Sequence, residues 1–548
     1  MNDATASLPV TGFAGLKAHW RGDLLSGFLV FLIALPLCLG ISMASGFPPS
    51  AGIITAIIGG VVVSRCSGSF ITINGPAAGL IVVVYDAVQS LGEGDAMLGY
   101  RYTLAAIVVA SIIQILMGIF KAGRLSSFFP ASVVHGMLAA IGIIIIAKQI
   151  HVVLGVTPEK GSLISTIAQI PESFANLNLE IAIIGFAGLA ILIIWSLIQD
   201  KTLKMIPAPL VVVLVGMFLG HYFQLEHQHI YLLQPDGSYS HTHADSLEVG
   251  PKFLVAISDN FTSSFYFPDF GKFFTLEFWE AVVAIALVGS LESLLSAMAV
   301  DKLDPYKRHS NLNKDLTAVG VGNLIAGSIG GLPMIAEIVR SSANVNNGAK
   351  TQWANFFHGT FLLIFVVFFP LLIHSIPLAA LASLLVFTGF RLASPREFAN
   401  VMGIGKEQLF IFIATIISVI ATDLLIGVGI GILVKLTIHV IHGVKLNNLF
   451  KIHFTQAVQT NGSILIHIKG AAVFSNFLAL KEALAEIEHG KTLIFDKSEV
   501  TLIDHTVMEF FHKFQHDYET QGGHCEIQGL EEHEAFSAHP LAARRIKS

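Results

Sequence analysis

The sequence predicts a polytopic α-helical membrane protein built from two inverted repeats, followed by a small soluble α/β domain. Of the 548 residues, 53% are hydrophobic and 13% are charged, whereas soluble domains carry about 25% charged residues. The deficit of charge is concentrated before residue 445. Two short segments broken by glycine and proline, around Pro76 and Pro333, also occupy matching places in the two halves of this apolar part.

The apolar part divides into fourteen candidate segments. Runs of about 17–25 apolar residues are candidate spanning helices, and they lie at roughly 24–45, 51–66, 102–120, 130–150, 181–198, 206–222, 279–299, 314–328, 353–374, 377–391, 407–424 and 426–443. Two half-helices, starting at residues 75 and 334, complete seven segments in each half. An odd number per half inverts the second repeat relative to the first, and the even total places both termini on one side of the membrane.

The two broken segments stand at a constant offset. Pro76 and Pro333 lie 257 residues apart, and the apolar runs that start at Leu24 and Trp279 lie 255 residues apart. Non-helical backbone is tolerated at membrane depth only where it lines a cavity or is buried in protein. Interrupted helices at equivalent places in two repeats indicate the substrate site of a secondary transporter, and this is the class of protein that the pattern predicts.

The charged loops predict the orientation, because cytoplasmic loops are enriched in lysine and arginine. With both termini in the cytoplasm, few basic residues fall in the outside loops, namely Arg101, Lys160, Lys252 and Lys272. The inside loops then hold most of them: Arg65, Lys121, Arg124, Lys201, Lys204, Lys302, Lys307, Arg308, Lys314, Arg340, Lys350, Arg391, Arg396 and Lys406. We therefore expect both termini to be cytoplasmic.

The same patterns predict the domain boundaries. We expect a transport domain at 1–445, with repeats at about 22–222 and 279–444 and an extracellular loop at 223–277. After residue 445, short β-type runs at 463–468 and 492–496 alternate with helical patterns. This alternation predicts a small cytoplasmic α/β domain at 446–548.

Other classes of function find little support. No basic block indicates nucleic acid, the three cysteines form no disulfide framework, and no nucleotide loop, metal triad or nucleophile–base pair indicates an enzyme or a resident cofactor. Two His-x-His pairs between residues 221 and 243, at His227 and His229 and at His241 and His243, could bind a metal ion. No cysteine accompanies them, so a solvated loop is the favoured interpretation.

The starts of the two half-helices form the expected substrate site. A helix N-terminus binds anions through its unpaired N–H groups and the positive end of its dipole. Two such starts facing each other would hold an anion without a permanently buried charge. The expected contacts are Asn74, Gly75, Pro76, Ala77 and Ala78 in the first segment and Pro333, Met334, Ile335 and Ala336 in the second. The alternative is that glycine and proline only kink two helices, and the constant offset argues against it.

Arg340 is expected near the far end of the second half-helix. An arginine within the membrane is costly and indicates function by default, and it could add positive potential to an anion site. The alternative is a side chain that extends to the cytoplasmic boundary, next to the polar residues that follow Arg340.

Two carboxylates are candidates for cation coupling. Glu292 is the only carboxylate within Val288–Ala297, and a buried carboxylate favours its protonated form unless a cation compensates it. It could carry a proton, or bind Na⁺ together with Ser296 one turn further on. Glu337 is expected in the first turn of the second half-helix, where coupling and helix capping are equally supported. A structural hydrogen bond is the alternative for Glu292.

At these residues the chain resembles the sulfate permease (SulP) family of anion transporters, and the resemblance covers nearly the whole chain. The shared motifs are Gly22–Gly27, Gly46–Pro49, Asn74–Ala78 and Gly331–Thr351. The family implies a uracil-permease-like fold of fourteen segments with core and gate subdomains, a cytoplasmic STAS domain and a homodimer. The tail resembles STAS through Asp496–Thr506, although His505 stands where bacterial relatives often have a phosphorylatable serine.

Within the family, the chain looks closest to the bacterial branch encoded beside, or fused to, carbonic anhydrase. The residues that carry this are Ala34–Gly40, Asp301–Lys307 and Ile338–Asn346, while Pro36-Leu37 replaces the Pro-Gln of many sulfate-transporting members. That branch implies bicarbonate as substrate, a link to carbonic anhydrase and the bacterial inner membrane. Glu292 matches proton-coupled members, since sodium–bicarbonate symporters have aspartate there.

We therefore expect a secondary active transporter of small inorganic anions in a lipid bilayer, with bicarbonate favoured over sulfate and with H⁺ or Na⁺ as coupling ion. Two alternatives stay open. One is a sulfate or dicarboxylate transporter of the same fold. The other is a non-transporting sensor or scaffold whose STAS domain binds partners.

Overall fold

The computed structural model describes residues 8–123, 129–158, 163–200, 203, 206–230, 248–257, 261–487, 490–520 and 522–547. The chain forms two compact units, one made of residues 1–123 and 141–391 and the other of residues 124–140 and 392–548. His241 and His243, half of the predicted metal site, lie outside the described residues, as do Arg124, Lys160, Lys201 and Lys204.

The first unit is helical, and the described residues between its helices form two short pairs of strands and a few 3₁₀ turns. Its helices are α1 (Gly12–Ala44), α2 (Pro49–Ile58), a π-helical turn (Gly59–Val63), α3 (Ser64–Cys66), α4 (Ile81–Gly92), α5 (Ala96–Ile119), the second part of α6 (Ala131–Val153), α7 (Leu163–Ala168), α8 (Ile170–Ala175), α9 (Leu179–Leu197), α10 (Ala208–Tyr222), α11 (Leu276–Leu303), α12 (Leu312–Ser328), α13 (Ile338–Asn346), α14 (Trp353–Phe368), α15 (Pro370–His374) and α16 (Leu378–Leu392). Its strands are β1 (Asn74–Pro76), β2 (His229–Ile230), β3 (Glu248–Val249) and β4 (Met334–Ala336).

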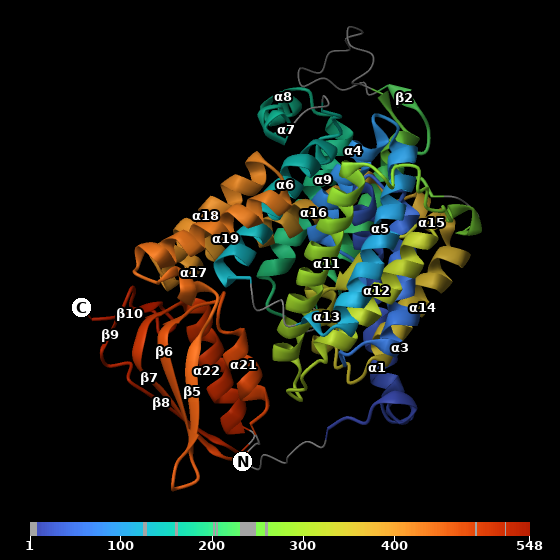
Figure 1. Ribbon diagram of the computed structural model, residues 1–548. Helices are drawn as coiled ribbons and strands as arrows, with labels where there is room; N and C mark the ends of the chain where they lie inside the picture. The colour runs from blue at the N-terminus through green and yellow to red at the C-terminus, as the bar shows by residue number, and fades with distance from the viewer. Residues whose placement is uncertain are drawn as a thin grey trace. The chain divides into compact units, whose positions relative to one another are not determined.

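Small residues let these helices pack closely, as is common between membrane helices. A side chain on Gly27 of α1 would meet the backbone of Ala354 in α14, and one on Gly60 would meet Gly359 of the same helix. In Figure 1, α5, α11 and α12 run side by side in the same unit. Glycine at these points therefore sets how near α14 comes to the first helices of the chain.

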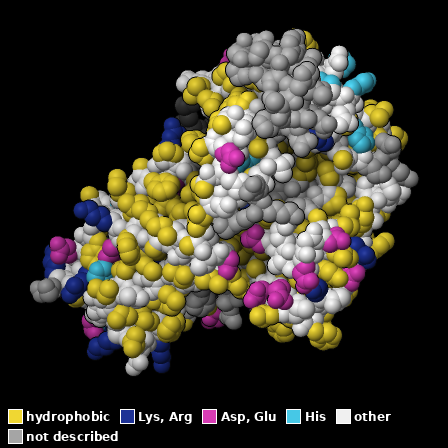
Figure 2. Space-filling view, turned by 90° about the horizontal axis from the view of Figure 1, so that it is seen from above, with side chains coloured by type: hydrophobic (Ala, Val, Ile, Leu, Met, Phe, Trp, Pro, Cys, Tyr) yellow, Lys and Arg dark blue, Asp and Glu magenta, His cyan; other side chains and the backbone are white. Residues whose placement is uncertain are grey.

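The membrane-spanning character predicted from the sequence agrees with the helices observed. Eight helical stretches among the described residues are long and apolar enough to cross a membrane, and α10, α14 and the helix at 78–92 are shorter apolar helices. Large apolar side chains are exposed on the outer helices, including Leu197, Phe218, Phe368, Leu371 and Leu433. Figure 2 shows many hydrophobic side chains on the coloured part of the face in view, as expected where lipid replaces water.

The second unit contains the start of α6 and the C-terminal part of the chain. Its further helices are α17 (Pro395–Ile404), α18 (Lys406–Ala421), α19 (Leu424–Ile441), α20 (Leu446–Leu449), α21 (Leu478–Ala485) and α22 (His505–Thr520). Its strands are β5 (His453–Val458), β6 (Ile464–Ala472), β7 (Thr492–Ile503), β8 (His524–Gln528), β9 (His533–Ala535) and β10 (Arg544–Ile546).

The six strands form one sheet in the order β5-β6-β7-β10-β9, with β8 also paired to β7. Ile464, Ile466 and Ile468 of β6 alternate inward, as a strand buried on one face requires. Helices α21 and α22 lie against the sheet (Figure 1), and Phe511 of α22 packs edge-on against Phe495 of β7. The predicted α/β pattern of the tail is therefore confirmed.

Three details differ from the sequence expectations. Helix α1 begins at Gly12, ahead of the expected apolar run, because its first turns include polar residues such as Lys17 and Arg21, which a search for apolar runs leaves out. The expected segment 353–374 is divided by Pro370, which lacks an N–H and begins α15. Helix α17 was not predicted, because its polar residues, among them Arg396 and Glu397, make Pro395–Ile404 too polar for a spanning segment.

A buried ion pair ties α19 to the sheet domain. Lys435 Nζ lies 3.4 Å from Asp504 Oδ2, and both side chains are almost fully buried. Asp504 also accepts hydrogen bonds from the N–H groups of Phe474 and Val507, the second of which caps α22. Removing either partner would leave a buried charge uncompensated, which costs several kcal/mol.

The buried Lys497 predicts how the stability of the sheet domain depends on pH. Its ammonium is buried over the ring of Phe511, at 3.5 Å from the ring centroid, and burial lowers the pKa of this lysine to about 7. The unfolded chain keeps the proton up to about pH 10. Between these values the unfolded state binds more protons, so stability rises with pH.

We expect amides of β7 and α22 to gain protection between pH 7 and 9, by roughly 1 kcal/mol per pH unit, in hydrogen exchange of the whole protein corrected for intrinsic rates. Lys497→Met should remove this gain and raise protection at pH 7. The same substitution at exposed Lys469 is the control. An unchanged pH dependence in Lys497→Met would contradict the assignment.

Candidate functional site

The two broken segments cross as a short antiparallel sheet. Strand β1 pairs with β4 so that Asn74 lies opposite Ala336, Gly75 opposite Ile335 and Pro76 opposite Met334. This is the relation that two inverted repeats produce at their shared axis. The sequence offset therefore predicted correctly which segments meet.

The predicted helix starts, at residues 75 and 334, are wrong. Residues 74–76 and 334–336 are extended, the first half-helix begins with a 3₁₀ turn at Ala78–Leu80, and the second begins at Ile338. The reason is that buried N–H and C=O groups need partners, and pairing the two strands supplies them where no water is available. Pro76 and Pro333 thus precede the helices and are not their first residues.

Side chains from neighbouring helices hold the crossing in place. Asn323 of α12 accepts a hydrogen bond from Met334 N–H at 2.6 Å and donates to Met334 O at 3.2 Å. Ser293 of α11 accepts from Ala336 N–H at 3.2 Å. Ser341 accepts from Ile73 N–H at 2.8 Å. Buried side chains thereby meet several of the polar backbone groups that the strand pair leaves open.

Arg340 lies in the first turn of α13, directly behind the crossing. Its side chain is 0% exposed, and its three nitrogens have no hydrogen-bond partner among the described residues. A Cβ on Gly75 would overlap the guanidinium. The expected place near the far end of the half-helix is wrong because α13 starts four residues later than predicted. The alternative of a side chain at the membrane boundary is also wrong, since the group is buried.

Glu292 lies against the start of the first half-helix. It is 6% exposed, neither carboxylate oxygen has a partner in the described part of the chain, and a Cβ on Gly79 would overlap the carboxylate. Ser296 is buried one turn further along α11. The hydroxyl that reaches the crossing is instead that of Ser293, which the sequence analysis passed over.

Glu337 is the N-cap residue of α13, with extended backbone, and not a residue of its first turn as predicted. A backbone hydrogen bond joins Ala78 to its carboxylate, while Oε1 has no partner within the described residues. The Glu337 carboxylate therefore accepts the hydrogen bond of the Ala78 N–H group, which was expected to bind a substrate anion.

Polar residues of α14 complete the site and were missed by the sequence analysis. Asn355 donates to Asn74 Oδ1 at 3.1 Å and to Gly59 O at 3.3 Å. His358 is 0% exposed, and both ring nitrogens lack a partner in the described structure. The sequence held a signal for His358, because an ionisable residue within an apolar run indicates function by default. Both residues were counted only as parts of the apolar segment 353–374.

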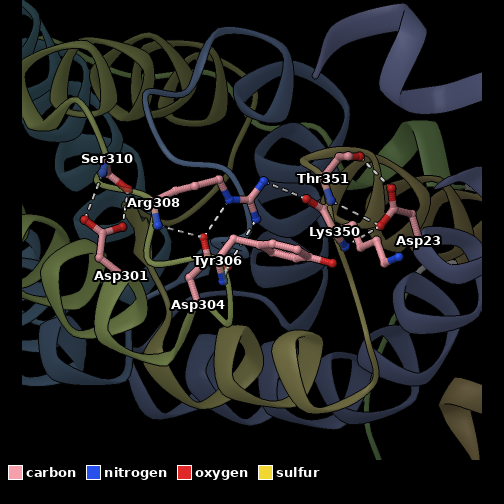
Figure 3. Close-up of polar contacts among 8 residues, drawn as sticks. All are labelled: Asp23, Asp301, Asp304, Tyr306, Arg308, Ser310, Lys350 and Thr351. Carbon is pink, nitrogen blue, oxygen red and sulfur yellow. Dashed lines mark hydrogen bonds and ion pairs between the residues drawn. The ribbon is translucent and has the colours of Figure 1, made fainter. Parts of the chain in front are cut away.

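A polar network at one end of this unit holds the elements that carry the site (Figure 3). Asp23 of α1 accepts hydrogen bonds from Lys350 N–H at 2.8 Å and from Thr351 Oγ1 at 2.5 Å. Arg308 bonds Asp304 at 2.6 Å and Lys350 O at 2.9 Å. The motifs Gly22–Gly27, Asp301–Lys307 and Gly331–Thr351 thus meet in one place and fasten the segment after α13 to α1.

The site has an unusual balance of charge. Two carboxylates and one guanidinium converge on the crossing, all buried and each with at least one atom unpaired among the described residues. A buried ion that lacks partners is costly, so this arrangement is suited to hold a mobile anion near Arg340 and a cation near the carboxylates. No group of three His, Cys, Asp or Glu that could hold a metal ion occurs in the described part of the chain.

Comparison with known proteins identifies the class. The pattern of the sulfate permease family matches residues 20–415, and that of the STAS domain matches residues 455–535. The chain therefore belongs to the sulfate permease family and is a multi-pass anion transporter with a C-terminal STAS domain.

Individual relatives agree with this assignment. The chain is 26% identical over 521 residues to the putative sulfate transporter YvdB of Bacillus subtilis, covering 93% of this chain and 92% of the relative. It is 25% identical over 423 residues to the bicarbonate transporter BicA of Picosynechococcus, covering 76% and 70%. These relatives are transporters, not enzymes.

Two solved structures confirm the fold class. The transmembrane domain of a cyanobacterial bicarbonate transporter BicA matches with a TM-score of 0.61 at 24% identity, over 75% of this chain and 97% of that domain. The structure of SLC26A9 matches with a TM-score of 0.63 at 15% identity, over 94% and 85%.

Gly79→Ala tests the contact with Glu292. The added methyl group would overlap the carboxylate, so we expect a loss of transport of tenfold or more with little change in the yield of folded protein. Flux into proteoliposomes measures this. The control is Gly429→Ala in α19, where a Cβ meets nothing within 4 Å. Equal transport by the two variants would contradict the placement.

Arg340→Ala tests the anion contact. Loss of a buried positive charge next to the crossing should raise the apparent KM for the anion at least tenfold, which is about 1.4 kcal/mol. Arg340→Lys should restore part of the affinity because a point charge contributes to the potential. Arg391→Ala, at an exposed arginine, is the control. A KM unchanged in Arg340→Ala would exclude a role in binding.

Proposed function

We propose that the chain is a secondary active transporter of bicarbonate ahead of sulfate, driven by protons through Glu292 and Glu337. The observation that carries the proposal is the convergence of two buried carboxylates with unpaired oxygens on the crossing that also holds Arg340. A relative whose name states bicarbonate transport supports the choice of anion, as do the motifs of the carbonic-anhydrase-associated branch.

The charges account for coupling. With both carboxylates ionised and Arg340 protonated, the site carries one net negative charge and repels an anion. A proton on Glu337 removes the charge that is held at Ala78, so this N–H becomes available to the substrate. A proton on Glu292 then leaves Arg340 as the remaining charge and favours anion binding. Protonation and anion binding therefore support each other.

Co-transport also offsets an electrical cost. Moving one anion into a cell against the membrane potential costs about 2.3 kcal/mol per 100 mV. Of the two protons bound at Glu337 and Glu292, one cancels that cost for a monovalent anion, and the other adds drive together with the proton gradient. Na⁺ is the alternative coupling ion, and it would use Glu292 with Ser296 or backbone carbonyl groups as oxygen ligands.

The proposal also covers the oligomeric state, the membrane and the orientation of the protein. The chain would act as a homodimer in the bacterial inner membrane with both termini in the cytoplasm, where carbonic anhydrase interconverts CO₂ and bicarbonate. The distribution of lysine and arginine among the loops supports this orientation.

Sulfate is the second candidate, because relatives described as putative sulfate transporters match along more than nine-tenths of the chain. Uptake of labelled bicarbonate and sulfate by proteoliposomes, under separate proton and sodium gradients, distinguishes the two anions and the two cations. Absence of flux for every anion would favour the sensor or scaffold alternative.

Glu292→Gln tests the coupling. We expect this variant to lose accumulation driven by the proton gradient while it retains exchange of anion across the membrane. The matched control is Glu280→Gln, the same change at an exposed position of the same helix. Accumulation as steep as that of the wild type would show that Glu292 is structural, and Glu337→Gln would then be examined for the same loss.

A further inference from the structure

Lys148 is an ionisable residue inside a candidate membrane-spanning helix, and the site above does not use it. It belongs to α6, inside a helix long and apolar enough to span a bilayer. Its side chain is 22% exposed, and Nζ lies 3.8 Å from Asp86 Oδ1 and 3.6 Å from the centroid of the Tyr85 ring. Lysine within a span is expensive and indicates a functional role.

The pair with Asp86 is a weak reason to keep a lysine there. The separation of 3.8 Å is longer than a hydrogen bond, and the Asp86 side chain is 58% exposed. An ion pair with a solvated partner and a long separation contributes little to stability. Lys148 is mostly withdrawn from solvent, while the Asp86 carboxylate is mostly solvated. An anion that replaced this carboxylate would therefore meet a poorly hydrated ammonium.

The position of the pair connects it to the crossing. Tyr85 and Asp86 lie on α4, which continues the 3₁₀ turn at Ala78–Leu80 that lies against Glu292 and Glu337. Asp86 is eight residues beyond Ala78, which corresponds to about 12 Å along a helix. The same helix therefore presents an anion-binding N-terminus at one end and reaches the ammonium of Lys148 two turns further on.

We propose that Lys148 forms a second anion-binding site, an outer subsite at which the transported inorganic anion replaces the Asp86 carboxylate on its way to or from Arg340. This rests on the proposed function of anion transport. The Lys148 ammonium offers N–H donors to oxygens of bicarbonate or sulfate, and the ring of Tyr85 covers one side of it. Asp86 holds the lysine when no anion is present and competes with the substrate for it.

Because Asp86 and the substrate anion would compete for Lys148, loss of Lys148 and loss of Asp86 should shift the KM in opposite directions. Lys148→Gln removes the binding group, so the apparent KM should rise at least tenfold for anion added on the side where the α4–α5 turn lies. Asp86→Asn removes the competitor, so the KM from that side should fall threefold or more. The maximal rate and the KM from the other side should change less than twofold in both variants.

A purely structural ion pair would behave differently. Both single substitutions would then impair transport alike, and the charge-swapped protein with Asp86→Lys and Lys148→Asp would recover. We expect the swap to remain impaired, because it moves the ammonium to a different helix. Lys148→Arg should keep most of the affinity. The control is Lys272→Gln, which breaks the exposed pair with Glu93 near the end of the same half-helix and should leave the KM unchanged.

The measurement uses the full-length protein in proteoliposomes of known orientation, with bicarbonate and sulfate as separate substrates. Binding of each anion to the detergent-purified protein, followed by thermal shift, gives Kd values without any gradient or flux. If the wild type moves neither anion, the proposed function fails while the Kd values still decide on Lys148. Equal effects of Lys148→Gln and Asp86→Asn, rescue by the charge swap, or Kd values unchanged in Lys148→Gln would overturn the proposal.

Discussion

The pairing of β1 with β4 is the constraint on which the rest of the site depends. Two helices are interrupted at membrane depth, and their open backbone groups can be satisfied only by protein. The strands satisfy each other at Asn74–Ala336, Gly75–Ile335 and Pro76–Met334, and Asn323 and Ser293 take further backbone groups. Because both half-helices begin directly after these strands, their N-termini are held on either side of one point.

Two buried carboxylates and one buried guanidinium are concentrated at that point. Arg340 reaches it from the first turn of α13, Glu292 from α11 and Glu337 from the N-cap of α13. In this structure Glu337 occupies the amide of Ala78, so a protein carboxylate stands where a substrate anion would bind. Asp86 stands in the same relation to Lys148. Both proposals thus give an internal carboxylate the same role. Glu337 and Asp86 hold the anion-binding groups while no anion is present, and the anion must displace these carboxylates.

The elements that carry these groups are held by contacts far from them in sequence. Asp23 binds the backbone after α13, and Arg308 binds both Asp304 and Lys350 O. Glycine at Gly75 and Gly79 leaves space for the Arg340 and Glu292 side chains. Substitution of either glycine would therefore act on the charged residue rather than on the backbone, which neither glycine needs for a positive φ.

The sequence by itself determined the class of fold, the offset of the two breaks and the α/β pattern of the tail, because apolar run length, proline spacing and strand periodicity are local properties. It also indicated Glu292, Glu337 and Arg340, since charge within an apolar run is rare. It misplaced the helix starts and Arg340, because glycine and proline mark an interruption without stating whether strand or helix follows. Only the tertiary structure decided that, through backbone pairing between segments 257 residues apart. It also brought Asn355 and His358 to the crossing and Lys148 to Asp86, contacts that depend on which faces of separate helices meet.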